Sequence, residues 1–267
     1  MNQELLDAYQ NGKILLFIGA GISSTLGLPT WSQLIDYIAK SLEYDPDVFK
    51  SYGDFLSLAE YYNIQKGKIG QLRSWMDKEW HSDHIKIEES NIHKLIVKGN
   101  FPLIYTTNYD NWIEKACQYY NIKYNKIIDV NDIANSVPNQ REIIKFHGDF
   151  SDDSSIVLGE TSYFERLDFN TPLDIKLRAD SLGRTVLFIG YSLRDINTRY
   201  LFYKLTNLWD KYGGNFRKPK SFIFMSKPNP IQEIVLRQWG IETISSNEED
   251  PGNVLENFLI DLTQLKD

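Results

Sequence analysis

The chain has 267 residues, of which 42% are hydrophobic and 24% charged, and this length suits one large α/β domain with or without an insertion. Its net charge of −7 disfavours direct binding to nucleic acid, because nucleic-acid-binding domains ordinarily present a basic face. The single cysteine, Cys117, excludes an internal disulfide and any zinc site that needs two or more cysteines, and it favours a reducing compartment.

Residues 1–13 are polar and of mixed charge, so they lack the apolar stretch of a signal peptide. The longest apolar runs elsewhere are too short to cross a bilayer. We therefore expect a cytoplasmic protein with no membrane partner.

Short apolar runs alternate with helical patterns along nearly the whole chain. Thr30 and Gln33 fit a capping box, and the pair Thr171-Pro172 fits an N-cap followed by the first helical position. The alternation predicts an α/β fold with a doubly wound, mostly parallel, Rossmann-like sheet. The expected strands are Ile14–Ile18, Leu103–Thr107, Lys126–Val130, Ile143–Phe146, Ile156–Leu158, Thr185–Ile189, Ser221–Met225 and Ile241–Ile244.

One gap interrupts this alternation. Some eighty residues separate the strand that ends at Ile18 from the strand that begins near Leu103, and a single crossover helix needs far fewer. Apolar residues recur within the gap at helical spacing. We therefore predict one domain over residues 1–267 that carries a helical insertion at roughly 43–98.

Glycine and polar residues follow four of the expected strands. Because ligands of open parallel sheets bind at the carboxyl ends of the strands, these four segments are candidate site residues. They are Gly19-Ala20-Gly21-Ile22-Ser23, Thr106-Thr107-Asn108-Tyr109-Asp110, His147-Gly148-Asp149 and Gly190-Tyr191-Ser192.

The glycine turn has two readings. It fits a phosphate site after a buried strand, and a tight connection between strand and helix is the alternative. Ser24 stands where a dinucleotide fingerprint has its third glycine, and no strand ends in an acid about twenty residues further on. These departures argue against an ordinary dehydrogenase.

The other segments also have structural alternatives. Asn108 and Asp110 fit a helix start, and Asp195 after Gly190-Tyr191-Ser192 fits an N-cap. A lone histidine at a strand end is often only a hydrogen-bonded surface group, but His147 also fits a general base. His81 and His84 fit a solvated helix end better than a metal site.

Taken in order, Gly19-Ala20-Gly21-Ile22-Ser23, Thr107-Asn108-Tyr109-Asp110, His147-Gly148 and Gly190-Tyr191-Ser192 resemble the sirtuin NAD-binding core. The resemblance implies that the glycine turn, with Gly19, Ala20, Gly21 and Ser23, holds the NAD pyrophosphate. It implies that Asn108 contacts the nicotinamide ribose and orders the attacking water, and that Asp110 holds the carboxamide. It further implies that His147 is the base and that Gly190 and Ser192 line the adenosine side.

The departures from protein-deacylase sirtuins are informative. One cysteine cannot build their four-cysteine zinc module, Pro29-Thr30-Trp31 replaces their Asp-Phe-Arg stretch, and Thr107 replaces a glutamine. The pattern resembles the bacterial sirtuin-like NADases of anti-phage defence, which implies NAD+ as substrate, no zinc and no other metal. By position, Trp31 is expected to wall the pocket.

The resemblance also implies partners. It suggests a homo-oligomer that acts with a second defence protein, such as a HerA-like ATPase. The alternative functions are an ADP-ribosyl transferase, a residual protein deacylase, a non-catalytic NAD or ADP-ribose sensor, and a generic α/β subunit that serves assembly. Having both Asn108 and His147 argues against a pure sensor, because binding alone does not require both.

Overall fold

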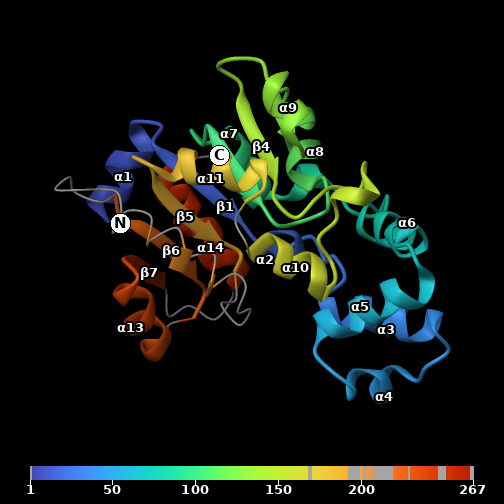
Figure 1. Cartoon of the computed structure of the whole chain (residues 1–267). Coiled ribbons are helices and arrows are strands. Elements are labelled where there is room, and N and C mark those ends of the chain that lie inside the picture. The colour runs from blue at the N-terminus through green and yellow to red at the C-terminus, as the bar shows by residue number, and fades with distance from the viewer. Residues whose placement is uncertain are drawn as a thin grey trace.

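The computed structural model describes residues 2–167, 170–191, 199–200, 203–204, 207, 219–227, 229–245 and 251–264. Its centre is a seven-stranded sheet with the order β3-β4-β2-β1-β5-β6-β7, in which every pair of neighbouring strands is parallel (Figure 1). The predicted doubly wound sheet is therefore confirmed. The strands are β1 (Ile14–Ile18), β2 (Leu103–Thr106), β3 (Tyr124–Ile127), β4 (Arg141–Lys145), β5 (Thr185–Ile189), β6 (Ser221–Met225) and β7 (Ile241–Ser245).

Strand β1 lies at the centre of the sheet and is buried over its whole length. Its alternate residues face opposite layers: Ile14, Leu16 and Ile18 join one core cluster, while Leu15 and Phe17 join another. This is why the strand reads as a continuous apolar run rather than as an alternating pattern.

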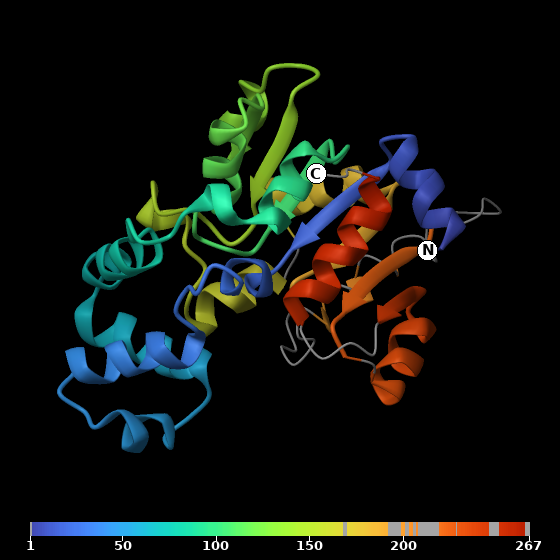
Figure 2. The same ribbon diagram turned by 180° about the vertical axis from the view of Figure 1, so that it is seen from behind.

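Helices cover both faces of the sheet, as Figures 1 and 2 show. One face packs against α1 (Gln3–Gln10), α7 (Asn91–Lys98), α8 (Trp112–Tyr119) and α14 (Pro251–Thr263). The other packs against α9 (Val130–Ala134), α11 (Pro172–Ser181) and α13 (Pro230–Gln238). The short helix α2 (Ala20–Ser24) and helix α10 (Glu160–Leu167) lie beside each other at the carboxyl edge of the sheet in both views.

A third apolar cluster lies away from the sheet. It is formed by α3 (Trp31–Ser41), α4 (Pro46–Lys50), α5 (Phe55–Lys66) and α6 (Gly70–Trp80), which project to one side in both views. The one-turn helix η1 (Ile87–Glu89) and helix α7 follow, and the buried apolar residues of both belong to the sheet cluster. The single domain with a helical insertion over residues 43–98 stays a prediction. Helices α4 to α6 support the insertion, because their buried apolar residues belong to the third cluster and to neither cluster of the sheet.

Local sequence signals fix several element ends. Thr30 caps α3 with a complete capping box, and Thr171 with Pro172 opens α11 as expected. Strands β1, β5 and β6 match their predicted bounds, whereas β3 and β4 begin two residues earlier than predicted.

The strand predicted at Ile156–Leu158 is wrong. This segment runs without regular structure from the one-turn helix η2 (Asp153–Ser155) to α10, and Ile156 and Leu158 are buried in the third cluster. An apolar run of three residues signals burial alone, and here helices rather than neighbouring strands bury it. Among the residues that the structure describes, no helix is both long and apolar enough to span a bilayer.

Candidate active site

A pocket of about 340 Å³ lies at the carboxyl ends of the central strands. It gathers residues from the segments that follow β1, β2, β4 and β5, together with Trp31 from α3. Eight residues predicted from the sequence line it: Ala20, Gly21, Ser23, Trp31, Asn108, Asp110, His147 and Gly190. The predicted Ser192 lies outside the described residues.

The glycine turn is packed against the end of β5. The amides of Gly19 and Gly21 donate to the carbonyls of Ile189 and Gly190, both at 2.9 Å, so neither is a bare donor for an anion. A Cβ on Gly21 would lie 2.8 Å from the Gly190 carbonyl oxygen, and Gly190 itself has φ +74°. The turn therefore needs glycine first of all for the close approach of two chain segments.

Asn108 is held in one orientation by the turn. Its Nδ2 donates to the Ser23 hydroxyl at 2.9 Å and to the Gly19 carbonyl at 3.2 Å. Its backbone amide donates to the Thr106 hydroxyl at 3.0 Å. Its Oδ1 is buried and has no hydrogen-bond partner among the residues described. A buried acceptor of this kind is costly unless water or a ligand pairs with it, and this one belongs to a residue that lines the pocket.

Asp110 completes the network around Asn108. Its Oδ2 accepts from the Ser23 hydroxyl at 2.6 Å, and its Oδ1 accepts from the backbone amide of Trp112 at 3.2 Å. The second bond satisfies a donor of the first turn of α8, so the predicted helix-start role is present. Asp110 also lines the pocket, and its predicted role in binding stays a prediction.

His147 follows β4 and lines the same pocket. Its ring stacks on Phe146, with centroids 5.8 Å apart, and meets the edge of the Tyr163 ring at 5.1 Å. Burial, and then the neighbouring Arg166 guanidinium, lower the pKa of His147 to about 3. The imidazole is therefore neutral at pH 7 and able to accept a proton, although as a weak base.

Residues at the C-terminal end of α6 hold the loop that carries Asn108 in place through hydrogen bonds. His81 Nδ1 lies 2.6 Å from Asp77 Oδ1, and His81 Nε2 accepts the backbone amide of Asn111 at 3.0 Å. The Trp80 carbonyl accepts the indole N–H of Trp112 at 2.8 Å. His81 is thus not part of a solvated helix end as predicted; its side chain is 10% exposed and fixes the loop.

A second pocket, of about 370 Å³, continues the first past the glycine turn. The two share Ala20, Gly21, Ser24, Gly190 and Tyr191. The second extends to the end of β6 and to the first turn of α14. Together they form an elongated site with the two glycine segments at its middle.

The chain also matches a known protein family. Residues 102–244 fit the family described as SIR2-like domain. The chain belongs to the SIR2-like domain family. The matched range contains Asn108, Asp110, His147 and Gly190.

Similar proteins come from bacteria. The SIR2-like chain is 30% identical over 243 residues to "Defense-associated sirtuin 2" of Bacillus subtilis, covering 88% of this chain and 23% of that protein. It is 29% identical over 202 residues to "NAD(+) hydrolase ThsA" of Bacillus cereus, covering 73% and 40%. It is 30% identical over 221 residues to the ThsA protein of Cytobacillus dafuensis, covering 81% and 43%. The chain therefore spans less than half the length of these relatives.

A solved structure from work on the mechanism and regulation of Sir2 enzymes also aligns with the SIR2-like chain. The alignment covers the whole of both chains, with 14% identity and a TM-score of 0.47.

Sequence reasoning missed several parts of this SIR2-like site. Trp80 and Tyr163 line the pocket from distant segments, and only the fold brings them there. A signal was present for Lys145, a lysine inside the buried run Ile143–Phe146. Within the described part of the chain, no group of three or more His, Cys, Asp or Glu side chains is arranged to hold a metal ion. The absence of zinc stays a prediction.

Proposed function

We propose that this chain hydrolyses NAD+ at the nicotinamide–ribose bond, giving nicotinamide and ADP-ribose. The observation that carries the proposal is the meeting, in one pocket, of a neutral His147 and an Asn108 whose buried Oδ1 has no protein partner among the described residues. The names of the curated relatives, NAD(+) hydrolase and defence-associated sirtuin, support it.

The shape of the site fits a dinucleotide. NAD+ has two nucleoside halves joined by a pyrophosphate, and the two pockets join at the glycine segments. The pocket that contains Asn108 and His147 would take the nicotinamide riboside half, and the pocket that reaches α14 would take the adenosine half. The pyrophosphate would then pass Ala20, Gly21 and Gly190, as the sequence resemblance implies.

Asn108 would position the attacking water. The Nδ2 contacts with Ser23 and Gly19 fix the amide, and Oδ1, which has no partner among the described residues, would accept a hydrogen bond from a water in the pocket. A fixed acceptor orders a water without having to reorient during the reaction. Cleavage of a glycosidic bond passes through an oxocarbenium-like transition state, which a positioned water can capture.

His147 would accept a proton from the ribose hydroxyl or from the water. Its lowered pKa keeps it neutral at pH 7, and removal of a general base commonly lowers the rate by about 10²- to 10⁴-fold. Asp110 would hold the carboxamide while it fixes Ser23, and Trp31 would wall the pocket.

The biological setting is part of the same proposal. NAD+ depletion in bacterial anti-phage defence fits the printed name of the Bacillus subtilis relative. A homo-oligomer in the cytoplasm, a second defence protein such as a HerA-like ATPase, and the lack of a nucleic-acid partner remain proposals from the sequence.

Nicotinamide release from NAD+ tests the function. The wild-type protein should release nicotinamide and ADP-ribose, alone or with the product of its neighbouring gene, and Asn108→Ala and His147→Ala should lose that activity. Asn135→Ala and His84→Ala, at exposed positions, are the matched controls. No release by the wild-type protein in either form would refute the hydrolase, and release by both site variants would refute the site assignment. Label transferred from NAD+ to protein would instead identify a transferase.

A further inference from the structure

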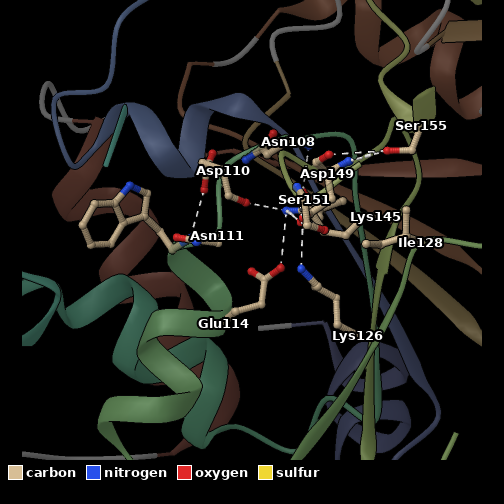
Figure 3. Close-up of polar contacts among 12 residues, drawn as sticks. Asn108, Asp110, Asn111, Glu114, Lys126, Ile128, Lys145, Asp149, Ser151 and Ser155 are labelled. Atoms are coloured by element: carbon tan, nitrogen blue, oxygen red, sulfur yellow. Dashed lines mark hydrogen bonds and ion pairs between the residues drawn. The ribbon is translucent and has the colours of Figure 1, made fainter. Parts of the chain in front are cut away.

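A fully buried lysine lies directly beneath the proposed site. Lys145 ends β4, and its side chain is 0% exposed. Its ammonium donates to the backbone carbonyl of Asp110 and lies 3.5 Å from Glu114 Oε1 and 3.7 Å from Asp149 Oδ2 (Figure 3). Lysine is rarely buried to this extent without specific partners, so the position needs a reason.

Stability alone is a weak reason. Removing charged groups from water is costly, and buried ion pairs can often be replaced by apolar residues of similar volume without loss of stability. The Glu114 carboxylate is also imperfectly paired, because neither of its oxygens has a hydrogen-bond partner among the described residues. Burial raises the pKa of Glu114, and Lys145 opposes that rise. The cluster is therefore costly to keep.

The proposed reaction does not use the ammonium directly. Lys145 does not line either pocket of the proposed site. Its ammonium instead contacts the Asp110 carbonyl, which lies beyond the last backbone hydrogen bond between β2 and β4. Thr106 is the register partner of Lys145, and the last bond between the two strands runs from the Phe146 amide to the Thr106 carbonyl at 2.8 Å.

The segments that follow β2 and β4 carry the two proposed catalytic residues, Asn108 and His147. The β2 segment continues to Asn108 and Asp110, and the β4 segment continues to His147 two residues after Lys145. Asp110 in turn holds Ser23, which orients the Asn108 amide. One side chain from the His147 strand thus fixes the loop that carries Asn108.

We propose that Lys145 is a positioning residue, which sets the placement of Asn108 relative to His147 by holding the Asp110 carbonyl. This inference rests on the proposed hydrolysis for its effect on rate. Its effect on structure does not depend on turnover.

The test separates positioning from folding. Lys145→Met alone leaves Glu114 as a buried acid without its cation, so that variant is expected to lose stability. The double variant Lys145→Met/Glu114→Gln removes both charges, while Asp149 keeps its contacts with Lys126 and Ser151. We expect the double variant to recover most of the melting temperature but to keep a kcat about 10- to 100-fold below wild type with little change in KM.

The matched control changes a similar ion pair away from the loop. Lys176 in α11 contacts Glu142 at 2.7 Å and Asp180 at 2.8 Å, and none of the three lines the pocket. Lys176→Met/Glu142→Gln should therefore leave kcat unchanged.

The outcomes distinguish the two proposals. Recovery of kcat together with stability in the Lys145→Met/Glu114→Gln variant would overturn the positioning role. A crystal structure of that variant decides the same question without turnover: a shift of residues 107–111 relative to His147 supports the role, and an unchanged loop refutes it. Failure of the wild-type protein to release nicotinamide would refute the hydrolase alone, because the crystal comparison still stands.

Discussion

The side-chain nitrogen of Asn108 lies 2.9 Å from the hydroxyl oxygen of Ser23, and that hydroxyl donates its proton to Asp110 Oδ2 at 2.6 Å. Ser23 comes from the glycine turn, whereas Asn108 and Asp110 come from the loop after β2. The three-residue chain of hydrogen bonds fixes which side of the Asn108 amide faces outward. It leaves Oδ1 as the acceptor for a water or a substrate.

Replacing Ser23 tests this orientation. Ser23→Ala removes one of the two acceptors of Asn108 Nδ2 and the donor to Asp110, and an unpaired buried polar group costs about 1–3 kcal/mol. We expect the variant to lose stability for that reason, and we expect kcat for nicotinamide release to fall roughly 10-fold or more, because the Asn108 amide is no longer held in one orientation for the reaction. Ser41→Ala, which removes a bond of Ser41 to the Ile38 carbonyl, is the control. A Ser23→Ala enzyme with wild-type kcat would contradict the assigned network.

The pH dependence of the rate tests His147. Its pKa is lowered to about 3, first by burial and then by Arg166, so the neutral base persists throughout pH 5–8. The pH profile of kcat/KM should therefore lack an acidic limb near 6.5 that belongs to His147. Arg166→Gln removes a nearby positive charge, so the pKa of His147 should rise towards 6.5, as an NMR titration of the ring would measure. A His147 resonance that titrates near 6.5 in the wild-type protein would show that this environment is wrongly described.

His81 tests the link between the third cluster and the loop. His81→Phe keeps an aromatic ring between Trp112 and Phe150 but removes the acceptor for the Asn111 amide. We expect kcat to fall about 5- to 10-fold, because the loop loses one of its fixed contacts. His84→Phe, at an exposed position outside the pocket, should have wild-type kcat. Equal kcat in the two variants would mean that the His81 contact has no part in catalysis.

Alanine substitutions at Gly190 and Gly27 distinguish the effect of backbone strain from the effect of steric crowding. Both have positive φ, at +74° and +78°, but only at Gly190 would an added Cβ meet other atoms, with the Gly19 carbonyl oxygen at 2.8 Å. Both alanine variants should lose the stability that left-handed backbone costs an alanine, about 1 kcal/mol. Only Gly190→Ala should also weaken NAD+ binding in calorimetry, since the segment shared by both pockets has to move. Unchanged affinity in Gly190→Ala would remove this turn from the proposed binding site.

His93 gives the protein an acid-sensitive core. Burial lowers its pKa from 6.5 to about 4, so below pH 6.5 the unfolded chain takes up a proton that the native state does not bind. The free energy of unfolding should therefore fall as the pH drops from 6.5 to about 4, with a slope of at most about 1.4 kcal/mol per pH unit from this histidine. Denaturant melts at several pH values should show that the free energy of unfolding depends less steeply on pH for His93→Gln than for His84→Gln. Identical slopes would contradict the role of His93.

The periodic parts of the sequence predicted the architecture well. Buried parallel strands are continuous apolar runs, and helix caps such as Thr30 depend on a few adjacent residues, so both are readable locally. The same logic failed at Ile156–Leu158. Burial by helices and burial by neighbouring strands leave the same short apolar run, and only contacts distant in sequence distinguish them.

The parallel sheet, its glycine turn and the polar residues at its strand ends could be predicted from the amino-acid sequence, because each follows from local periodicity and backbone chemistry. What those residues contact could be learned only from the folded chain. In the fold, the Gly19 and Gly21 amides donate to backbone carbonyls at the end of β5. His81, at the C-terminal end of α6, accepts the Asn111 amide, and Lys145 donates to the Asp110 carbonyl. Hydrogen bonds and ion pairs between residues far apart in the chain depend on the packing of whole elements, and no local pattern records them.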